Sequence, residues 1–245
     1  MLGRDESRYG EFSLVEPVEG VACALSVGSD PDAPSLAFKG DRAQPNEDGL
    51  LVGWEESRIL LAVADGHRGQ ASSHLILARV ADWPRVPANR GELALLSTGL
   101  TEPPWPGRSG TSLLLAVFDP RSGEGFGLAW GDSSLCLVGP AGARFLTRGN
   151  DKFLRGDAPC EPTWGEALSF QVSPDELLLA FTDGVNECHY QSPLTSVGAD
   201  DLVNALRSGP SPAAVCREVT QSALRGVRGF PGGQDNLALI VASRL

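Results

Sequence analysis

The sequence predicts an α+β domain with mostly antiparallel sheets, and three observations support this. Eight short apolar runs have the length of strands, and Gly, Pro, Asn or Asp flank them. Three stretches carry the periodicity and end signals of helices. The apolar runs follow one another in series instead of alternating with helices, which favours antiparallel pairing.

The elements can be assigned in chain order. The predicted strands cover residues 21–27, 49–54, 58–64, 112–118, 125–130, 134–139, 176–182 and 236–242. Turn sequences within 112–147 predict a meander of three or four strands there. The predicted helices cover 69–84, which Pro84 ends, 198–209, which Gly209 ends, and 211–226, which Ser211 can cap and Gly226 can end.

The chain has 245 residues and shows no internal repeat and no long linker. We therefore expect one domain over residues 21–245, preceded by a polar arm, residues 1–20, that is loosely held.

Composition excludes several classes of function. A net charge of −11 argues against nonspecific binding of nucleic acid and against an anionic membrane surface. No apolar stretch approaches the length of a membrane span, and the N-terminus lacks the apolar region of a signal peptide. The five cysteines are scattered and odd in number, which favours reduced thiols in a cytoplasmic protein.

Acidic residues recur at the ends of the apolar runs. Asp65 and Asp183 follow two runs and are each followed by Gly, and Asp132 lies in a Gly-Asp-Ser turn; Glu47, Asp48 and Asp235 precede other runs. Each alone is compatible with a simple turn. Together they form the all-oxygen set that hard divalent cations prefer, provided that the fold brings them together.

Six blocks of the sequence, taken in order, resemble the metal-dependent protein phosphatases of the type 2C serine/threonine class, in a minimal form of bacterial type. The blocks are NED, ADGHRG, SGTS, WGDSS, TDGVNE and GGQDN, and the match extends from Lys39 to Leu245. The resemblance implies two packed antiparallel β-sheets flanked by antiparallel helices, an α-β-β-α sandwich. It also implies two Mn²⁺ or Mg²⁺ ions at one end, and a third in bacterial members.

Site residues follow from the resemblance, position by position. It implies that Asp65 bridges both metals and that Gly66 offers its carbonyl to one of them. Asp183 and Asp235 would complete one metal site, and Glu47 would act on the other metal through water. Asp48 would be a ligand or lie behind the ligands, and Asp132 would help to hold a third metal. The implied reaction is hydrolysis of phosphoserine or phosphothreonine by a metal-bridging water. His67 would protonate the leaving alkoxide. An incidental turn histidine is the alternative, and His74 and His189 are expected to be structural or exposed.

The chain departs from the family pattern around the substrate. The family's phosphate-binding arginine lies five residues before the Asp of the acidic pair, whereas Arg42 lies six before Asp48. Arg42 can still fill the role if the chain bulges, Lys39 can replace it, or the role is lost. Arg68 stands at a glycine-like position of the DGH turn, where it binds phosphate or faces solvent. The flap after residue 151 is predicted to be very short.

The predicted partner is a phosphoprotein, a substrate of a serine/threonine kinase, and neither nucleic acid nor membrane is expected. We expect a monomer. Two rival functions stay open: hydrolysis of small phosphomonoesters on the same centre, and a pseudophosphatase that binds phosphoproteins or regulates a kinase.

Overall fold

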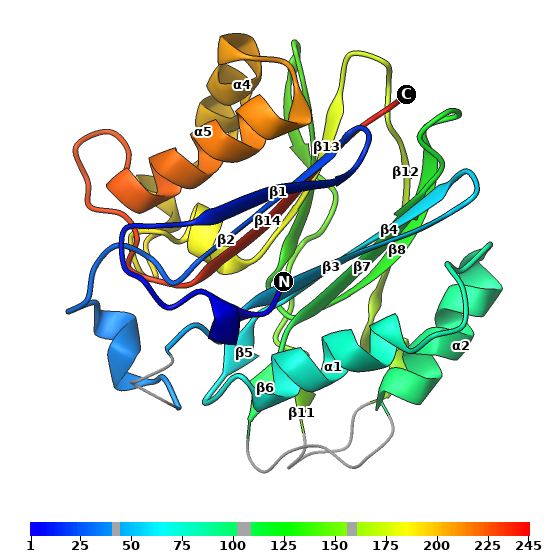
Figure 1. The fold of residues 1–245 in the computed structure, drawn as a ribbon, viewed down its shortest axis with the longest axis horizontal. Coiled ribbons are helices and arrows are strands. Elements are labelled where there is room, and N and C mark those ends of the chain that lie inside the picture. Colours follow the sequence, from blue (N-terminus) through cyan, green and yellow to red (C-terminus); the bar gives the residue numbers. More distant parts are fainter. Residues whose placement is uncertain (41–44, 102–108, 156–160) are drawn as a thin grey trace.

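Two antiparallel sheets face each other across the centre of the molecule, and helices cover both outer faces (Figure 1). The structure is a computed structural model that describes residues 1–40, 45–101, 109–155 and 161–245. This arrangement confirms the predicted α-β-β-α sandwich.

The first sheet has the order β1-β2-β14-β13-β9-β10. Its strands are β1 (Ser13–Val18), β2 (Val21–Ser26), β14 (Leu237–Ser243), β13 (Leu177–Phe181), β9 (Ser134–Gly139) and β10 (Gly142–Phe145). The outer face of this sheet is covered by α4 (Ala199–Ser208) and α5 (Pro212–Arg225).

The second sheet has the order β12-β8-β7-β4-β3. Its strands are β12 (Glu166–Gln171), β8 (Glu124–Trp130), β7 (Leu113–Phe118), β4 (Arg58–Ala64) and β3 (Gly49–Glu55). The helices on its outer face are α1 (Ala71–Ala81) and α2 (Arg90–Thr101).

Smaller elements lie between these layers and at their ends. A three-stranded sheet joins β5 (Gly66–His67), β6 (Gly110–Thr111) and β11 (Leu154–Arg155). The short helices are η1 (Gly3–Asp5), η2 (Pro34–Ala37), η3 (Pro162–Trp164), α3 (Asp183–Asn186) and η4 (Pro193–Thr195).

The central strands are buried on both faces because a sheet lies on one side and helices on the other. Every residue of β2, β7, β9 and β13 is buried. One apolar cluster fills the space between the sheets, and two others lie under the helix pairs. This burial explains why the strands appear in the sequence as unbroken apolar runs.

All eight predicted strands and the three predicted helices are present. At the start of α5, the Ser211 side chain accepts a hydrogen bond from the Ala214 amide, which is the predicted cap. Helix α2 has no counterpart among the predicted helices, because Gly91 and Gly99 weaken its helical signal.

Two expectations are wrong. The meander ends after β8, because β9 pairs with β10 and β13 in the other sheet, so the turn at Gly131 crosses between the layers. The N-terminal arm is also part of the fold. β1 pairs with β2, and the Met1 amine donates to the Leu50 carbonyl at 2.9 Å. The alternation of β1 is weak because it is an edge strand that is half exposed.

Candidate metal centre

Strand pairing brings the acidic residues to one end of the sandwich, the left-hand end in Figure 1, where β14 begins. β3 and β4 are antiparallel, with Gly49 opposite Ala64, so the residues before β3 lie beside those after β4. β13 and β14 are antiparallel in the other sheet, which places the residue after Thr182 beside the residues before β14. Four chain segments that are distant in sequence thus meet at one place.

A cleft of about 390 Å³ opens at this end. Its lining includes every acidic residue that the sequence singled out except Asp48, together with three other candidate residues of the DGH turn: Glu47, Asp65, Gly66, His67, Arg68, Asp132, Asp183 and Asp235. Asp48 is buried behind the cleft, where its carboxylate accepts a hydrogen bond from the Thr182 hydroxyl at 2.7 Å. Asp48 therefore lies behind the cleft lining and not within it.

The sequence blocks hold one another in place through hydrogen bonds. The Thr111 hydroxyl and the Ser112 amide both donate to the Asp65 carbonyl, at 2.8 and 2.9 Å. The Asp65 amide donates to the Ser112 hydroxyl, which bonds to that of Ser133 at 2.7 Å. The SGTS and GDSS blocks therefore fix the backbone that carries Asp65.

In the terminal Asp-Asn pair, Asp235 lines the cleft, and the Asn236 side chain holds neighbouring backbone groups in place. The Asn236 side chain accepts from the Glu47 amide at 2.8 Å and donates to the Val27 carbonyl at 3.1 Å. Close packing also requires glycine beside these groups. A Cβ on Gly66 would lie 2.6 Å from the Glu47 carbonyl oxygen, and one on Gly184 would lie 1.7 Å from that of Asn236.

The carboxylates of the cleft are buried close together, so bound positive charge would stabilise their ionised forms. Burial, followed by repulsion from neighbouring carboxylates, raises the pKa of Asp65 and of Asp183 well above the ordinary value. Burial also raises the pKa of Asp132 to about 6. Among the described residues, Oδ1 of Asp132 is buried without a hydrogen-bond partner.

The donor set fits divalent cations. Ligand atoms of Asp65, His67 and Asp132 lie within 4.8 Å of one another. Closely spaced carboxylates that repel each other are stabilised by a bound Mn²⁺ or Mg²⁺, which takes oxygen ligands.

His67 lies at the edge of the acidic cluster. Its Nε2 atom is 3.6 Å from Asp65 Oδ2, and its ring contacts that of Phe153 edge-on, with the centroids 4.6 Å apart. Burial, then the charge of Lys39, lowers the pKa of His67 to about 4, so its imidazole is neutral at pH 7. A phosphate dianion in the cleft would oppose this shift, because negative charge favours imidazolium.

The cationic side chains of the cleft come from separate segments. Lys39 is buried, and its Nζ lies 2.8 Å from Asp235 Oδ1. Arg68 has a φ of 63°, which is uncommon for a residue other than glycine. Neither Arg68 nor Arg155 has a carboxylate partner among the described residues, and Arg42 lies outside the described residues.

Several lining residues were missed by sequence reasoning, among them Phe153, Arg155 and Glu187. Arg155 pairs with Gly110, which pairs on its other side with His67, so the arginine stands across a glycine from the histidine. Only the three-stranded sheet reveals this, since no sequence pattern marks its two-residue strands. Glu187 had a signal, because it follows Asp183 by one helical turn.

The remaining histidines lie away from the acidic cluster. The Nδ1 atom of His189 is 2.7 Å from the Thr195 hydroxyl, and His74 is half-buried on α1. Neither lines the cleft. None of the helices in the described ranges is long and apolar enough to cross a bilayer.

Comparisons with known proteins agree with this geometry. The family model described as stage II sporulation protein E (SpoIIE) matches residues 92–245. No match was found among curated protein sequences.

Solved structures share the fold over nearly the whole chain. The Mycobacterium tuberculosis serine/threonine phosphatase PstP/Ppp is 20% identical with a TM-score of 0.66, over 91% of this chain and 97% of that one. The PstP catalytic domain in complex with two manganese ions is 19% identical with a TM-score of 0.65, over 95% and 99%. RsbX in complex with magnesium is 14% identical with a TM-score of 0.59, over 94% and 98%.

Proposed function

The chain belongs to the SpoIIE family, which is of the metal-dependent phosphatase type, and we therefore propose that it hydrolyses phosphoserine or phosphothreonine in proteins. One observation carries this proposal: carboxylates from four strand ends, a neutral imidazole and two arginines without carboxylate partners among the described residues line a single cleft. Phosphomonoester hydrolysis can use carboxylates to hold metal ions, arginines to pair with the phosphoryl oxygens, and an imidazole as the acid once the negative charge of a bound phosphate favours its protonation.

The residues proposed to hold two Mn²⁺ or Mg²⁺ ions are Asp65, Gly66 through its carbonyl, Asp183, Asp235 and Glu47, with Asp132 at a third ion. When bound, such ions would neutralise a phosphate dianion and lower the pKa of a coordinated water molecule. The PstP and RsbX structures, which contain manganese and magnesium, support this choice of metals.

The protein groups supply the rest of the chemistry. His67 would give a proton to the leaving serine or threonine oxygen, and the Phe153 ring packs roughly perpendicular to its imidazole. Arg68 and Arg155 would pair with phosphoryl oxygens, which arginine binds through two parallel hydrogen bonds. Lys39 remains the alternative cation for that role, because its ammonium already lies among the carboxylates.

The two rival functions make different demands on the site. A pseudophosphatase tolerates loss of a ligand, yet each acidic residue expected at the metals lies at the cleft or directly behind it. A phosphatase of small phosphomonoesters needs no surface for polypeptide beside the cleft. A cytoplasmic monomer that reverses the action of a serine/threonine kinase remains our prediction for its setting.

The test is turnover of a phosphoserine peptide across a manganese titration. We expect hydrolysis that requires added Mn²⁺ or Mg²⁺ and that excess chelator abolishes. Asp183→Asn should lose most of this activity, whereas Asp175→Asn, at an exposed turn outside the cleft, should keep it. Full turnover in chelator, or wild-type turnover by Asp183→Asn, would contradict the proposal.

A further inference from the structure

We propose that an aromatic rim beside the cleft, made of Phe38, His189, Tyr190 and Phe230, binds apolar side chains next to the phosphorylated residue of a protein substrate. The inference rests on the proposed function and names the substrate class more closely. It concerns groups that the hydrolytic chemistry does not use.

The rim is continuous with the cleft on its inner side. Phe38 and Tyr190 both line the cleft, and their rings stack with centroids 6.4 Å apart. Phe38 is 65% exposed although it is a large apolar residue. A ring that contacts the cleft and also faces solvent is placed to touch whatever extends out of the cleft.

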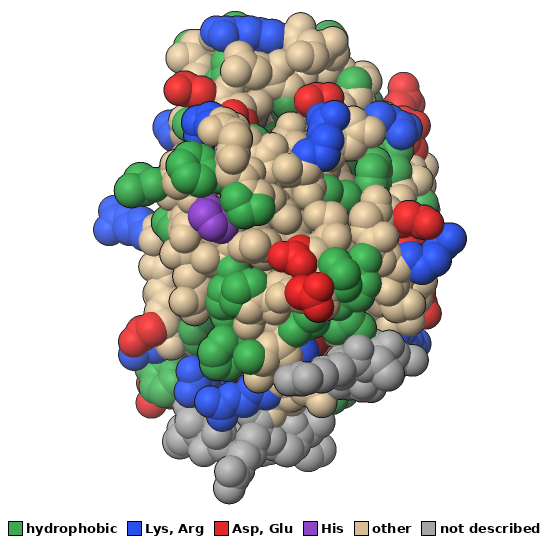
Figure 2. All heavy atoms as spheres, turned by 90° about the vertical axis from the view of Figure 1, so that its left-hand side faces the viewer, with side chains coloured by type: hydrophobic (Ala, Val, Ile, Leu, Met, Phe, Trp, Pro, Cys, Tyr) green, Lys and Arg blue, Asp and Glu red, His purple; other side chains and the backbone are tan. Residues whose placement is uncertain are grey.

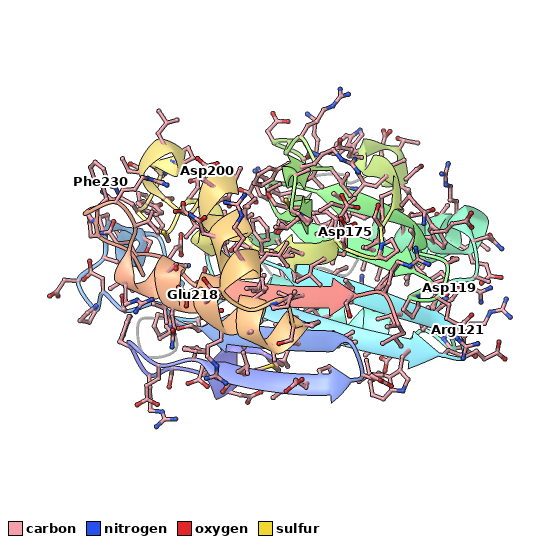
Figure 3. The ribbon with its side chains drawn as sticks, turned by 90° about the horizontal axis from the view of Figure 1, so that it is seen from above. Asp119, Arg121, Asp175, Asp200, Glu218 and Phe230 are labelled. Carbon is pink, nitrogen blue, oxygen red and sulfur yellow. The ribbon has the colours of Figure 1, made fainter. Side chains whose placement is uncertain are left out.

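The outer part of the rim pairs His189, which directly precedes Tyr190, with Phe230 from a different segment. The His189 ring stacks on that of Phe230 with centroids 5.8 Å apart and an angle of 21° between the planes. Phe230 is 44% exposed. Figure 3 places Phe230 at the end of the sandwich opposite Asp119 and Arg121, and Figure 2 shows hydrophobic side chains gathered around a histidine on this face.

The rim is held by the strand end that carries a proposed metal ligand. Gln234 accepts from the Tyr190 amide through Oε1 at 3.1 Å, and its own amide donates to the Cys188 carbonyl at 3.1 Å. The Gln234 carbonyl accepts from the Ser35 hydroxyl at 2.5 Å, three residues before Phe38. Gln234 directly precedes Asp235, so the aromatic rings and the ligand share one frame, and little ordering is needed on binding.

The chemistry of the rim selects its occupant. Phe38 and Phe230 expose apolar rings, 65% and 44% respectively, so the free-energy gain on binding comes from covering apolar surface. An extended chain rises about 3.3 Å per residue, so two rings 6.4 Å apart match roughly two residues of a bound polypeptide. Because Phe38 and Tyr190 line the cleft itself, we expect the apolar residues to lie close to the phosphoserine in sequence, in a polypeptide and not in a small metabolite.

The experiment compares two phosphoserine peptides that differ only in their flanking residues, Leu and Phe in one and Ser in the other. At saturating Mn²⁺, the wild-type kcat/KM should be about tenfold higher for the apolar peptide, mainly through KM, as expected for partial burial of one or two apolar side chains. Phe230→Ser and Phe38→Ser should each reduce this ratio, and the double variant should bring it close to one.

Controls separate the rim from the fold. Leu95→Ser removes a side chain that is 65% exposed on α2 and should keep the wild-type ratio. Phe230→Leu, which stays apolar, should keep most of it. A wild-type ratio near one would overturn the proposal, and so would variants that lose nitrophenyl phosphate turnover by the same factor as peptide turnover.

The proposed function can fail separately. A wild-type protein that hydrolyses neither the peptides nor nitrophenyl phosphate would contradict the phosphatase assignment. Fluorescence anisotropy of the two labelled peptides would then test the rim by itself. Equal Kd values would overturn it, and tighter binding of the apolar peptide that Phe230→Ser removes would support it.

Discussion

The Nζ atom of Lys39 lies 2.8 Å from Oδ1 of Asp235, and the two side chains are only 7% and 13% exposed. Burial alone would lower the pKa of this lysine, but the carboxylates of Asp235 and Asp65 outweigh it and hold the pKa above its ordinary value. Lys39 is therefore a permanent positive charge among carboxylates that repel one another. It stands where bound cations would supply the same neutralisation.

Replacing Lys39 should destabilise the metal-free protein more than the metal-bound protein. In chelator, Lys39→Met removes one partner of a buried ion pair, a change that typically costs about 3–5 kcal/mol. Bound Mn²⁺ would replace the lost charge, so the loss of Tm should be clearly smaller with metal. Lys152→Met is the matched control, because Lys152 is half exposed and pairs with an exposed Asp151. Equal losses of Tm in chelator and in Mn²⁺ would contradict this role.

The stability of the metal-free protein should fall as pH rises from 6.5 to 8.5. Burial raises the pKa of Asp48 to about 7, and burial with repulsion from neighbouring carboxylates raises those of Asp65 and Asp183 well above the ordinary value. The folded protein then holds protons that the unfolded chain has already released, so its stability is lost as pH rises through the folded pKa. His67 changes the stability only below about pH 6.5, because its folded-state pKa is lowered from the ordinary value of 6.5. The lowered pKa of the Met1 amine acts in the opposite direction.

A variant isolates the acidic cluster from that background. Asp183→Asn removes one of the repelling charges and leaves the Met1 amine unchanged. Thermal unfolding in chelator should therefore show a smaller fall of Tm with pH for Asp183→Asn than for the wild type, and a higher Tm at pH 8.5. Parallel curves for the two proteins would show that the cluster does not control this dependence.

Local patterns were sufficient to predict most strands. β2 and β13 are buried on both faces, so their residues form apolar runs that neighbouring turn residues delimit. β1 was missed because an edge strand buries little, and α2 was missed because Gly91 and Gly99 interrupt its signal. The crossing at Gly131 could not be predicted, since a turn between paired strands and one between layers use the same residues.

Some residues of the candidate site could likewise be predicted from the sequence, and others could not. Asp65 and Asp183 could be predicted because each follows an apolar strand and precedes a glycine. The resemblance to the type 2C phosphatases rests on the order of six sequence blocks, and this order carries information that residue types alone do not supply. Arg155 and the rim residue Phe230 could not be predicted, because their places depend on pairings and loops that have no periodic signal.

Asn236 should matter for stability as well as for the site. Asn236→Ala leaves the buried Glu47 amide and the Val27 carbonyl without their partners, which costs about 1–3 kcal/mol for each group. In a protein of this size, about 1 kcal/mol lowers Tm by roughly 2–4 °C, so we expect a loss of at least about 4 °C. Asn204→Ala, on the exposed face of α4, should change Tm by less than about 2 °C. A similar Tm for both variants would show that the bonds of Asn236 contribute little.

His67 and Arg68 are adjacent, yet the proposed function gives them duties that different substrates can separate. Phosphoserine has a poor leaving group, and a lost general acid typically costs 10²–10⁴-fold on such a substrate. Nitrophenolate leaves without a proton, so His67→Ala should keep far more of its activity on nitrophenyl phosphate.

Arg68, if it binds phosphoryl oxygens, contacts both substrates alike, so Arg68→Ala should lower kcat/KM by a similar factor for both, mainly through KM. The backbone of Arg68 has a φ of 63°, so Arg68→Gly serves as a second variant that removes the same side chain and relieves the strain. If His67→Ala loses the same factor on both substrates, it is not the acid; if both Arg68 variants keep wild-type KM values, the arginine faces solvent.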